Sequence, residues 1–227
     1  FTAGTEANKA NAKFDYMDGW VSSGMASHIG WAWRRAPGYH DVLTYTGDGS
    51  TQTISHNLGV PPEMIWIKSR SSGYEWQIWT SPLGIDSKFE LTNAAAGTGL
   101  WDDYTPTATN FKVIGVNSVN QSSATYIAYL FASVSGISKI GKYTGTGSNI
   151  DVDCGFSAGA RFVFIKRSDS TGDWYLYDSV RGIVAGNDPY LLMNSDAAQV
   201  TSTDYIDPLN AGFTVTSSAP ADLNTSG

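Results

Sequence analysis

The six residues YTGDGS at positions 45–50 recur as YTGTGS at positions 143–148, 98 residues later (143 − 45). The register holds on both sides of the motif, because 15 of the 60 pairs between residues 26–85 and residues 124–183 are identical. Many other pairs exchange one apolar residue for another. Apolar positions and turn glycines kept at a fixed spacing are typical of duplicated structural units. The sequence therefore predicts tandem repeats of about 98 residues.

The register of the repeat divides the chain into three parts. Residues 1–40 are interpreted as the tail end of a preceding unit, with a final strand over 26–35, plus a linker. Residues 41–135 are expected to form one complete unit. Residues 136–227 are expected to form a second unit that lacks its last strand. We expect the chain to be a segment of a longer tandem-repeat protein.

The missing strand has a counterpart elsewhere in the sequence. The first unit ends with ATYIAYLF (124–131), and the segment ASHIGWAW (26–33) aligns with it. Residues 26–33 are therefore a candidate to complete the sheet of the second unit, in the same chain or in a neighbouring copy. A sequence that is only part of its parent protein is the simpler explanation. The candidate strand-donating residues are Ala26, Ile29, Trp31 and Trp33.

The fold class follows from the rhythm of strands and turns. Short segments rich in β-branched and aromatic residues alternate with Gly, Ser, Asn, Asp and Pro breaks. In the complete unit they predict strands near 42–46, 51–55, 63–70, 74–80, 87–92, 110–116 and 124–132. Helical periodicity is absent. We expect an all-β protein made of tandem antiparallel β-sandwich repeats, either jelly-roll or Ig-like.

One strand is predicted to be covered on both faces. In MIWIK (64–68), Ile65 and Ile67 lie on one face, and Met64 and Trp66 lie on the other. A strand that is apolar on both faces is either a central strand covered twice or one that joins an interface.

The four glycines of the recurring motif are expected to form turns. Gly47, Gly49, Gly145 and Gly147 suit a hairpin-like connection that requires positive φ. A phosphate-binding loop is the less favoured interpretation, because no helix is expected to follow and supply its N-terminal amides.

Composition narrows the possible partners. The net charge of −7, without a cluster of Lys and Arg, argues against nucleic-acid binding, which requires a basic surface. No apolar run approaches the ~18 residues of a membrane-spanning helix, so we expect no membrane insertion. Cys154 is the single cysteine, so it forms no internal disulfide, and it is interpreted as a packing residue.

Two stretches resemble enzyme motifs without meeting their requirements. GFSAG (155–159) matches a nucleophile elbow, but a strand is expected after Ser157 and every histidine lies upstream. GISKIGKY (136–143) lacks the Ser or Thr of a phosphate-binding loop. The carboxylates near 102–103 and 151–153 are interpreted as solvated loop residues and not as calcium ligands. We therefore expect no enzyme, no catalytic residue, no cofactor and no metal.

The stretch YTGDGSTQTISHNLGVPPEMIWIKSRSS (45–72), followed in the next unit by YDSVRGI (177–183) and GFTV (212–215), carries a family resemblance. It resembles a domain of unknown function that is common in virion proteins of tailed bacteriophages. The first unit keeps His56, Leu58, Gly59 and Pro62, and the second keeps Asp178, Ser179, Arg181 and Gly182. Neither unit holds all the polar positions, so His56 and Arg181 are interpreted as fold residues. The resemblance implies a structural module, often in tandem, of tail fibres or other appendages.

The function expected on this basis is that of a non-enzymatic structural protein on the surface of a phage virion. It belongs to a tail fibre or appendage that contacts a host or a glycan. The alternatives are a capsid-decorating or cement protein, and a carbohydrate-binding module of a phage depolymerase. The expected partners are other virion proteins, further copies of the chain in a homo-oligomer and a host surface glycan. The candidate contact residues are Trp79, Trp101, Tyr104 and Tyr177. Packing is the alternative for each, and it is the preferred interpretation for Trp79.

Overall fold

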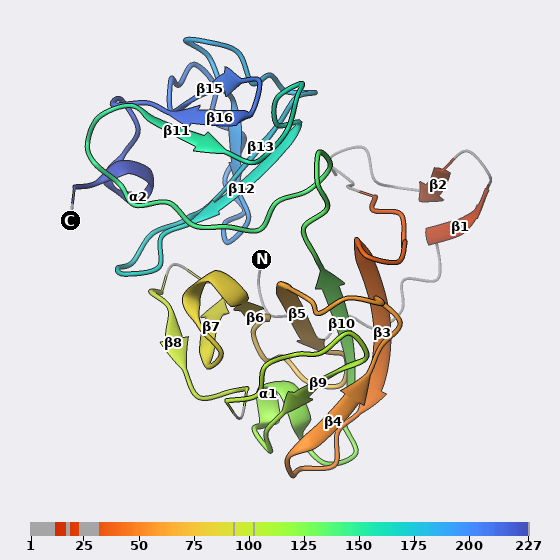
Figure 1. Cartoon of the computed structure of the whole chain (residues 1–227). Coiled ribbons are helices and arrows are strands. Elements are labelled where there is room, and N and C mark those ends of the chain that lie inside the picture. Colours follow the sequence, from red (N-terminus) through yellow and green to blue (C-terminus); the bar gives the residue numbers. More distant parts are fainter. Residues whose placement is uncertain (1–11, 17–18, 23–31, 93, 102, 227) are drawn as a thin grey trace.

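The computed structural model describes residues 12–16, 19–22, 32–92, 94–101 and 103–226. Within these ranges the chain is nearly all β, with several antiparallel sheets and only short helices. It forms two lobes, which we define as residues 36–135 and residues 136–226 (Figure 1). An N-terminal hairpin of β1 (Ala12–Tyr16) and β2 (Gly19–Ser22) precedes them.

The first lobe contains eight strands in its described residues. They are β3 (His40–Thr46), β4 (Gln52–Ser55), β5 (Met64–Ser69), β6 (Gln77–Thr80), β7 (Ser87–Glu90), β8 (Gly97–Thr98), β9 (Asn110–Val113) and β10 (Thr125–Phe131). A 3₁₀ turn, η1 (Ser81–Leu83), and a one-turn helix, α1 (Asn117–Asn120), connect them. One sheet has the order β3-β10-β5-β6-β7-β8, and a smaller sheet pairs β4 with β9.

The last strand of the first lobe lies in the middle of its sheet. β10 runs antiparallel to both neighbours, with Phe131 opposite His40 on β3 and opposite Met64 on β5. Its inward residues Tyr126, Ala128 and Leu130 have no exposed surface. The lobe therefore depends on its final segment for both sheet continuity and core volume.

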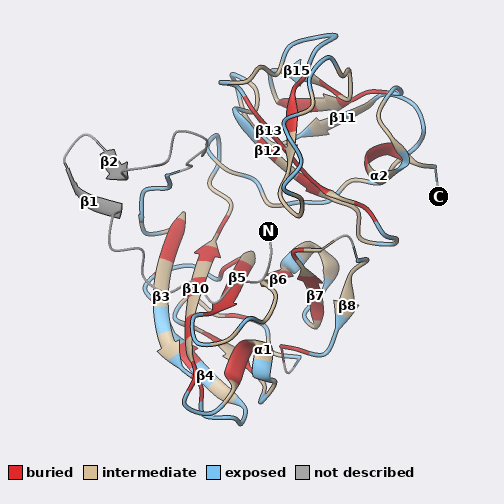
Figure 2. Cartoon of the chain, turned by 180° about the vertical axis from the view of Figure 1, so that it is seen from behind, coloured by how far each residue is buried: buried red, intermediate tan, exposed pale blue. Residues whose placement is uncertain are grey.

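The two faces of β5 serve different purposes. Ile65 and Ile67 are fully buried in the core of the first lobe, together with Phe111 of β9. Most of β5 is coloured as buried in Figure 2. Met64 and Trp66 point the other way and pack in a cluster that includes residues of the second lobe. Of the two alternatives predicted for this strand, both describe it: β5 lies inside its sheet with both faces covered, and its outer face joins the interface between the lobes.

The second lobe has its own core. Its elements are β11 (Ile150–Asp153), β12 (Phe162–Lys166), β13 (Trp174–Asp178), β14 (Tyr190–Leu192), β15 (Ile206–Leu209), β16 (Gly212–Val215) and α2 (Ala221–Asn224). They form the sheets β11-β16-β15 and β12-β13-β14. Tyr177, Ile206 and Val215 are fully buried at its centre.

Elements of the two lobes correspond in order and spacing. β11 starts 98 positions after β4 (150 − 52), and β12 starts 98 positions after β5 (162 − 64). β16 follows β9 by 102 positions (212 − 110), and α2 follows α1 by 104 (221 − 117). Among the described residues of the second lobe, no strand corresponds to β10. Residues 138–144, which correspond to β3, form no regular strand.

The YTGxGS motif does not close a hairpin. Residues 45–50 lead from β3 in one sheet to β4 in the other, so the chain crosses between sheets there. The hairpin prediction is therefore wrong, because neither strand pairs with the other. Positive φ is confirmed for the second glycine of each motif, at +79° for Gly49 and +73° for Gly147.

The first glycine of each motif is required for a different reason. A Cβ atom on Gly47 would lie 2.3 Å from the carbonyl oxygen of Gln121, and one on Gly145 would lie 2.3 Å from that of Thr225. Neither Gly47 nor Gly145 has a positive φ. These glycines therefore permit a close backbone approach and do not supply an unusual φ.

Replacing Gly47 with alanine is expected to destabilise the first lobe by about 3 kcal/mol, the upper end of the cost of overpacking, because a backbone carbonyl cannot move aside easily. The matched control is Gly38→Ala, which has φ +75° but no atom within 4 Å of its added Cβ. The control should cost only about 1 kcal/mol. Chemical denaturation of the three proteins checks the difference, and equal losses would contradict the close-approach explanation.

A buried asparagine from α1 holds the turn of the first lobe. The Oδ1 atom of Asn120 accepts a hydrogen bond from the Asp48 N–H at 3.0 Å, and its Nδ2 donates to the carbonyl of Ser50. The Tyr45 hydroxyl donates to the carbonyl of Val119 at 2.6 Å. The turn is thereby bound to the segment that precedes β10.

The same contacts recur in the second lobe. Asn224 Oδ1 accepts hydrogen bonds from the N–H groups of Thr146 and Gly147, both at 3.0 Å, and its Nδ2 donates to the carbonyl of Ser148 at 2.8 Å. Tyr143 donates to the carbonyl of Leu223 at 2.8 Å. Asn120 and Asn224 therefore perform the same task, and we call each set of contacts an asparagine clamp.

Candidate functional site

The two lobes meet through a cluster of apolar side chains that we call the aromatic junction. Its buried members are Ile78, Phe89, Leu91 and Trp174, and the side chains packed around them are Met64, Trp66, Trp76, Leu83, Ala96, Phe164 and Met193. The cluster forms because β5 and β6 of the first lobe and β12 and β13 of the second carry large apolar residues on their outer faces. Burial of these faces joins the lobes.

Trp174 lies at the centre of the aromatic junction. Its ring stacks on Phe164 with centroids 5.0 Å apart, and it meets Phe89 edge-on at 5.3 Å. Trp66 approaches Phe164 at 5.4 Å. Aromatic pairs in such arrangements contribute about 0.5–1.5 kcal/mol each beyond their buried area.

Hydrogen bonds also cross between the lobes. The indole N–H of Trp174 donates to the carbonyls of Glu90 at 3.2 Å and Thr92 at 2.9 Å. The N–H of Ala96 donates to the carbonyl of Ser168 at 2.9 Å. Directional bonds to main-chain atoms fix the orientation of the lobes more closely than apolar packing does alone.

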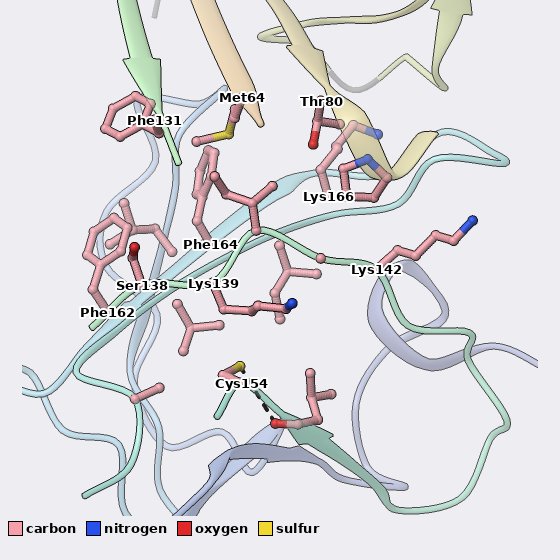
Figure 3. A pocket seen from close by; sticks show the side chains of 18 of the residues that line it. Met64, Thr80, Phe131, Ser138, Lys139, Lys142, Cys154, Phe162, Phe164 and Lys166 are labelled. Carbon is pink, nitrogen blue, oxygen red and sulfur yellow. Dashed lines mark hydrogen bonds between the residues drawn. The ribbon is translucent and has the colours of Figure 1, made fainter. Parts of the chain in front are cut away.

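A groove of about 1600 Å³ lies beside the junction and extends into the second lobe (Figure 3). Met64 and Phe131 line it from the first lobe, and Phe162 and Phe164 line it from the second. Further in, the groove reaches Cys154. An apolar groove of this size suits an apolar ligand or a peptide segment.

Lys166 provides an unusual positive charge at the groove. Its ammonium group lies 5.7 Å from the ring centroid of Phe89 and donates to the carbonyl of Arg167 at 2.8 Å. Burial lowers the pKa of Lys166 to about 8, although the carboxylates of Asp222 and Asp173 oppose the shift. A substantial fraction of this side chain is therefore a free amine in mildly alkaline solution.

Acylation of Lys166 by a soluble amine-reactive ester is expected to rise with a midpoint near pH 8. An ordinary lysine would give a midpoint about two units higher, near 10.4. The shift has this sign because burial disfavours the charged form of the side chain. Peptide mapping by mass spectrometry across pH 6–11 measures it, with Lys166→Arg as the control that removes the modified peptide. A midpoint near 10.4 would contradict the prediction.

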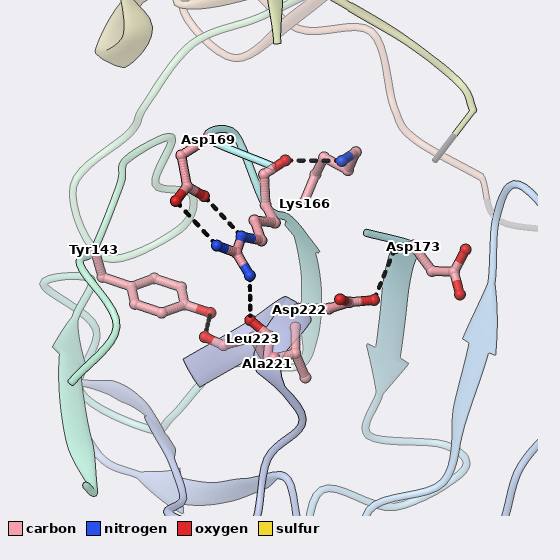
Figure 4. A network of polar contacts seen from close by, with 8 residues as sticks. Tyr143, Lys166, Asp169, Asp173, Ala221, Asp222 and Leu223 are labelled. Carbon is pink, nitrogen blue, oxygen red and sulfur yellow. Dashed lines mark hydrogen bonds and ion pairs between the residues drawn. The ribbon is translucent and has the colours of Figure 1, made fainter. Parts of the chain in front are cut away.

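Polar contacts attach α2 to the loop that connects the end of β12 to the start of β13 (Figure 4). Arg167 binds Asp169 through two hydrogen bonds of 2.8 and 3.1 Å and donates a third to the carbonyl of Ala221 at 3.1 Å. Asp222 accepts a hydrogen bond from the N–H of Asp173 at 3.2 Å. Exposed ion pairs contribute only about 0–1 kcal/mol. These contacts therefore position α2 more than they stabilise it.

Three of the aromatic rings predicted to contact a glycan or a partner are buried. Trp79 is 3 % exposed and donates its indole N–H to the carbonyl of Ile85 at 3.0 Å. Trp101 is 2 % exposed, and Tyr177 has no exposed surface. A ring stacks on a sugar only through a face that solvent reaches. The contact prediction is therefore corrected for these three residues, which pack inside the protein.

Tyr104 remains a candidate contact residue. It is half-buried, and its hydroxyl donates to Asn110 Oδ1 at 2.6 Å. The ammonium group of Lys112 lies 4.7 Å from the centroid of its ring. Its proposed role in binding a glycan stays a prediction.

The candidate strand-donating residues lie mostly outside the described residues. Ala26, Ile29 and Trp31 belong to that part of the chain. Trp33 is described and is 43 % exposed. Its ring meets Phe131 of the first lobe edge-on at 6.1 Å and Phe162 of the second at 5.8 Å.

The two family-pattern residues singled out in the sequence shape local structure. The Nδ1 atom of His56 accepts the N–H of Leu58 at 3.2 Å, while Nε2 faces the carbonyl of Thr107 at 3.2 Å. Burial lowers the pKa of His56, so the neutral ring is favoured. Arg181 pairs with Asp178, whose carboxylate also accepts the N–H of Arg181 at 2.9 Å. The His56 ring therefore satisfies nearby main-chain groups, whereas the Arg181 guanidinium pairs with a carboxylate that itself binds a main-chain N–H.

Cys154 packs against the core of the second lobe, and burial raises the pKa of its thiol. Within the described residues, no group of three His, Cys, Asp or Glu side chains could hold a metal ion. Asp102, one of the carboxylates considered in the sequence, lies outside those residues. No helix in the described part of the chain is long and apolar enough to cross a membrane.

The asparagine clamps were not predicted from the sequence. Asn120 and Asn224 each follow a buried aliphatic residue, Val119 or Leu223, near the end of a lobe. They lie 104 positions apart (224 − 120), beyond the stretch that aligns at 98. An aliphatic residue followed by asparagine recurs at an offset of 104, and this recurrence is the sequence signal for the clamps.

The chain was compared with known protein families, proteins and structures. A family model described as Domain of unknown function (DUF7483) matches residues 34–227. The match covers most of the chain, so the chain belongs to this family. It includes both lobes and the aromatic junction between them. No curated protein and no solved structure matches the chain.

Proposed function

We propose that the chain is a non-enzymatic structural module of a tailed-phage virion, made of tandem β-sandwich repeats of about 98 residues. The observation that carries the proposal is the aromatic junction, in which Trp174 binds the carbonyls of Glu90 and Thr92 across the lobes. A buried and hydrogen-bonded connection fixes the relative orientation of successive lobes, which suits a structural element of an extended assembly. The motif resemblance supplies the virion context.

The recurrence of local contacts supports the duplication. Two asparagine clamps hold two YTGxGS turns through equivalent atoms. The first glycine of each motif approaches a carbonyl oxygen at the same 2.3 Å distance from its hypothetical Cβ. Matching detail of this kind is expected from copies of one ancestral unit. We propose the jelly-roll or Ig-like type because the strands are short, antiparallel and arranged in paired sheets.

Within the virion, we place the module in a tail fibre or surface appendage with a face that contacts a host. Half-exposed rings at the groove favour a glycan as one class of contact. Trp33 and Phe162 are 43 % and 37 % exposed and lie edge-on to one another. Exposed aromatic faces can stack against sugar rings. A capsid-decorating role would use the same lobes to bind other virion subunits.

The test is to locate the chain on particles of the phage that encodes it. Mass spectrometry of purified virions should detect the protein, and cryo-electron microscopy should place it on an appendage. A regular position on the capsid lattice would support the decorating role instead. Absence from purified particles would contradict the virion proposal. A glycan array with a Trp33→Ala control tests the glycan contact separately.

A further inference from the structure

The inner wall of the groove is part of the core of the second lobe. Val163, Ile165 and Phe213 belong to that core and also line the groove. Val163 and Ile165 are 5 % and 7 % exposed, whereas their counterparts on β5 are fully buried. The core of the second lobe is therefore less completely covered on the side that β10 closes in the first lobe.

The backbone on this side is also suited to a further strand. β12 is an edge strand of the sheet β12-β13-β14 among the described residues. Its counterpart β5 pairs with β10 along six residues, from Met64 opposite Phe131 to Ser69 opposite Tyr126. The N–H and C=O groups along an edge strand are a template for another strand, and β12 offers this edge over residues 163–166 among the described residues. Across the groove, residues 138–144 take the place of β3 without forming a regular strand.

We propose that this groove is an acceptor site for a β-strand with the residue pattern of β10, which would lie antiparallel to β12. The inward positions of β10 carry a tyrosine, a small residue and a leucine, and these three side chains are fully buried in the first lobe. The same pattern fits the open side of the second core. The proposal concerns the fold of the second lobe and holds whether or not the protein belongs to a virion.

The inward tyrosine has specific partners. In the first lobe the Tyr126 hydroxyl accepts the N–H of Gln121 at 2.7 Å and donates to the carbonyl of Asn117 at 2.7 Å. At the 104-residue offset, Thr225 and Ala221 hold the corresponding positions around α2. A tyrosine on the incoming strand can therefore bind main-chain groups next to the second asparagine clamp.

Residues 26–33 are the principal competitor for this site. Trp33 aligns with Phe131 and lies beside Phe162, the counterpart of the residue that Phe131 faces on β5. In this register, however, the inward positions would be filled by His28, Gly30 and Ala32. Ala32 is much smaller than the leucine it would replace, Gly30 lacks the methyl group of alanine, and His28 is ionisable. Because unfilled core volume is destabilising, the pattern of β10 is the better occupant.

The test appends the segment ATYIAYLFA (124–132) directly after Gly227. This placement reproduces the spacing between α1 and β10, because Gly227 is the counterpart of Ser123 (227 − 104). The extension should raise the melting temperature of the second lobe by about 5 °C or more. Amides of β12 should become protected from hydrogen exchange. Alkylation of Cys154, which lines the groove, should slow by about tenfold, a change equivalent to 1.4 kcal/mol.

The controls change one face of the appended strand at a time. Tyr126→Asp with Leu130→Asp in the appended segment alters the inward face and should abolish all three effects. Ile127→Thr in the appended segment alters the outward face and should preserve them. Equal behaviour of the inward and outward variants would overturn the proposal, because the strand would then not enter the core.

Other occupants give distinguishable results. If an appended ASHIGWAW segment protects β12 and the β10 sequence does not, residues 26–33 are the occupant and the proposal is wrong. Protection of β12 in the unextended monomer would show that the chain already fills its own site. The same protection accompanied by dimers in size-exclusion chromatography would assign the site to a second copy. Each of these outcomes, or no effect of either extension, overturns the proposed occupant.

Discussion

Trp174→Ala is expected to separate the unfolding of the two lobes into distinct transitions and to cost about 3–5 kcal/mol. The variant removes the ring that contacts Phe89 and Phe164 and leaves the carbonyls of Glu90 and Thr92 without the indole N–H. The lobes keep their own cores, so each should still fold. Differential scanning calorimetry, with hydrogen exchange to assign each transition, measures the effect.

A conservative variant isolates the two contributions of Trp174. Trp174→Phe keeps an aromatic ring in the junction but removes the hydrogen-bond donor together with the second ring of the indole. It should cost about 1–2 kcal/mol and preserve coupled unfolding, since unpaired buried acceptors cost about that much. If Trp174→Ala unfolded in a single transition at nearly the wild-type temperature, the junction would not couple the lobes.

Asn120→Ala is expected to destabilise the first lobe by about 3–5 kcal/mol. The side chain has no exposed surface, and its removal leaves the N–H of Asp48 and the carbonyl of Ser50 without their partner. Each buried group deprived of its hydrogen bond costs about 1–3 kcal/mol. Asn224→Ala should have a similar effect on the second lobe, which makes the pair an internal replicate. Urea denaturation followed by lobe-specific hydrogen exchange measures both.

The control for the asparagine clamp lies on the same helical turn. Asn117 is exposed, so Asn117→Ala should change stability by less than about 0.5 kcal/mol. Asn120→Asp retains an acceptor for the Asp48 N–H but places a carboxylate against the Asp48 carboxylate and the Ser50 carbonyl, so its loss of stability should be at least as large as that of Asn120→Ala. Similar losses for Asn117→Ala and Asn120→Ala would point to the helix, and not to the clamp, as the source of stability.

Most strands of the first lobe lie close to the segments predicted from the sequence. The span 63–70 contains β5, and 124–132 contains β10. The apolar outer face of β5 also indicated an interface. These features are local, because alternation along a strand determines which side chains point inward.

The pairing of strands could not be obtained in this way. β10 inserts between β3 and β5, and alternation along a strand does not specify its neighbours. Because the neighbours of a strand are not specified by alternation, the YTGxGS turn was predicted to close a hairpin. In the structure it passes from one sheet to the other. The sequence also does not distinguish a buried ring from a contact residue, as Trp79 and Tyr177 show. A large aromatic side chain has the same sequence signature in a core and on a binding face.

Placing the final strand at the centre of a sheet affects how the lobe is made on the ribosome. β3 and β5 both pair with β10, so neither completes its ladder until Thr125–Phe131 has left the exit tunnel. The nascent chain must hold the earlier strands in an open arrangement until then, while their edges are free to pair wrongly. Translation pausing before residue 125 should therefore favour misfolding, and co-translational folding of the first lobe should occur late and in one step.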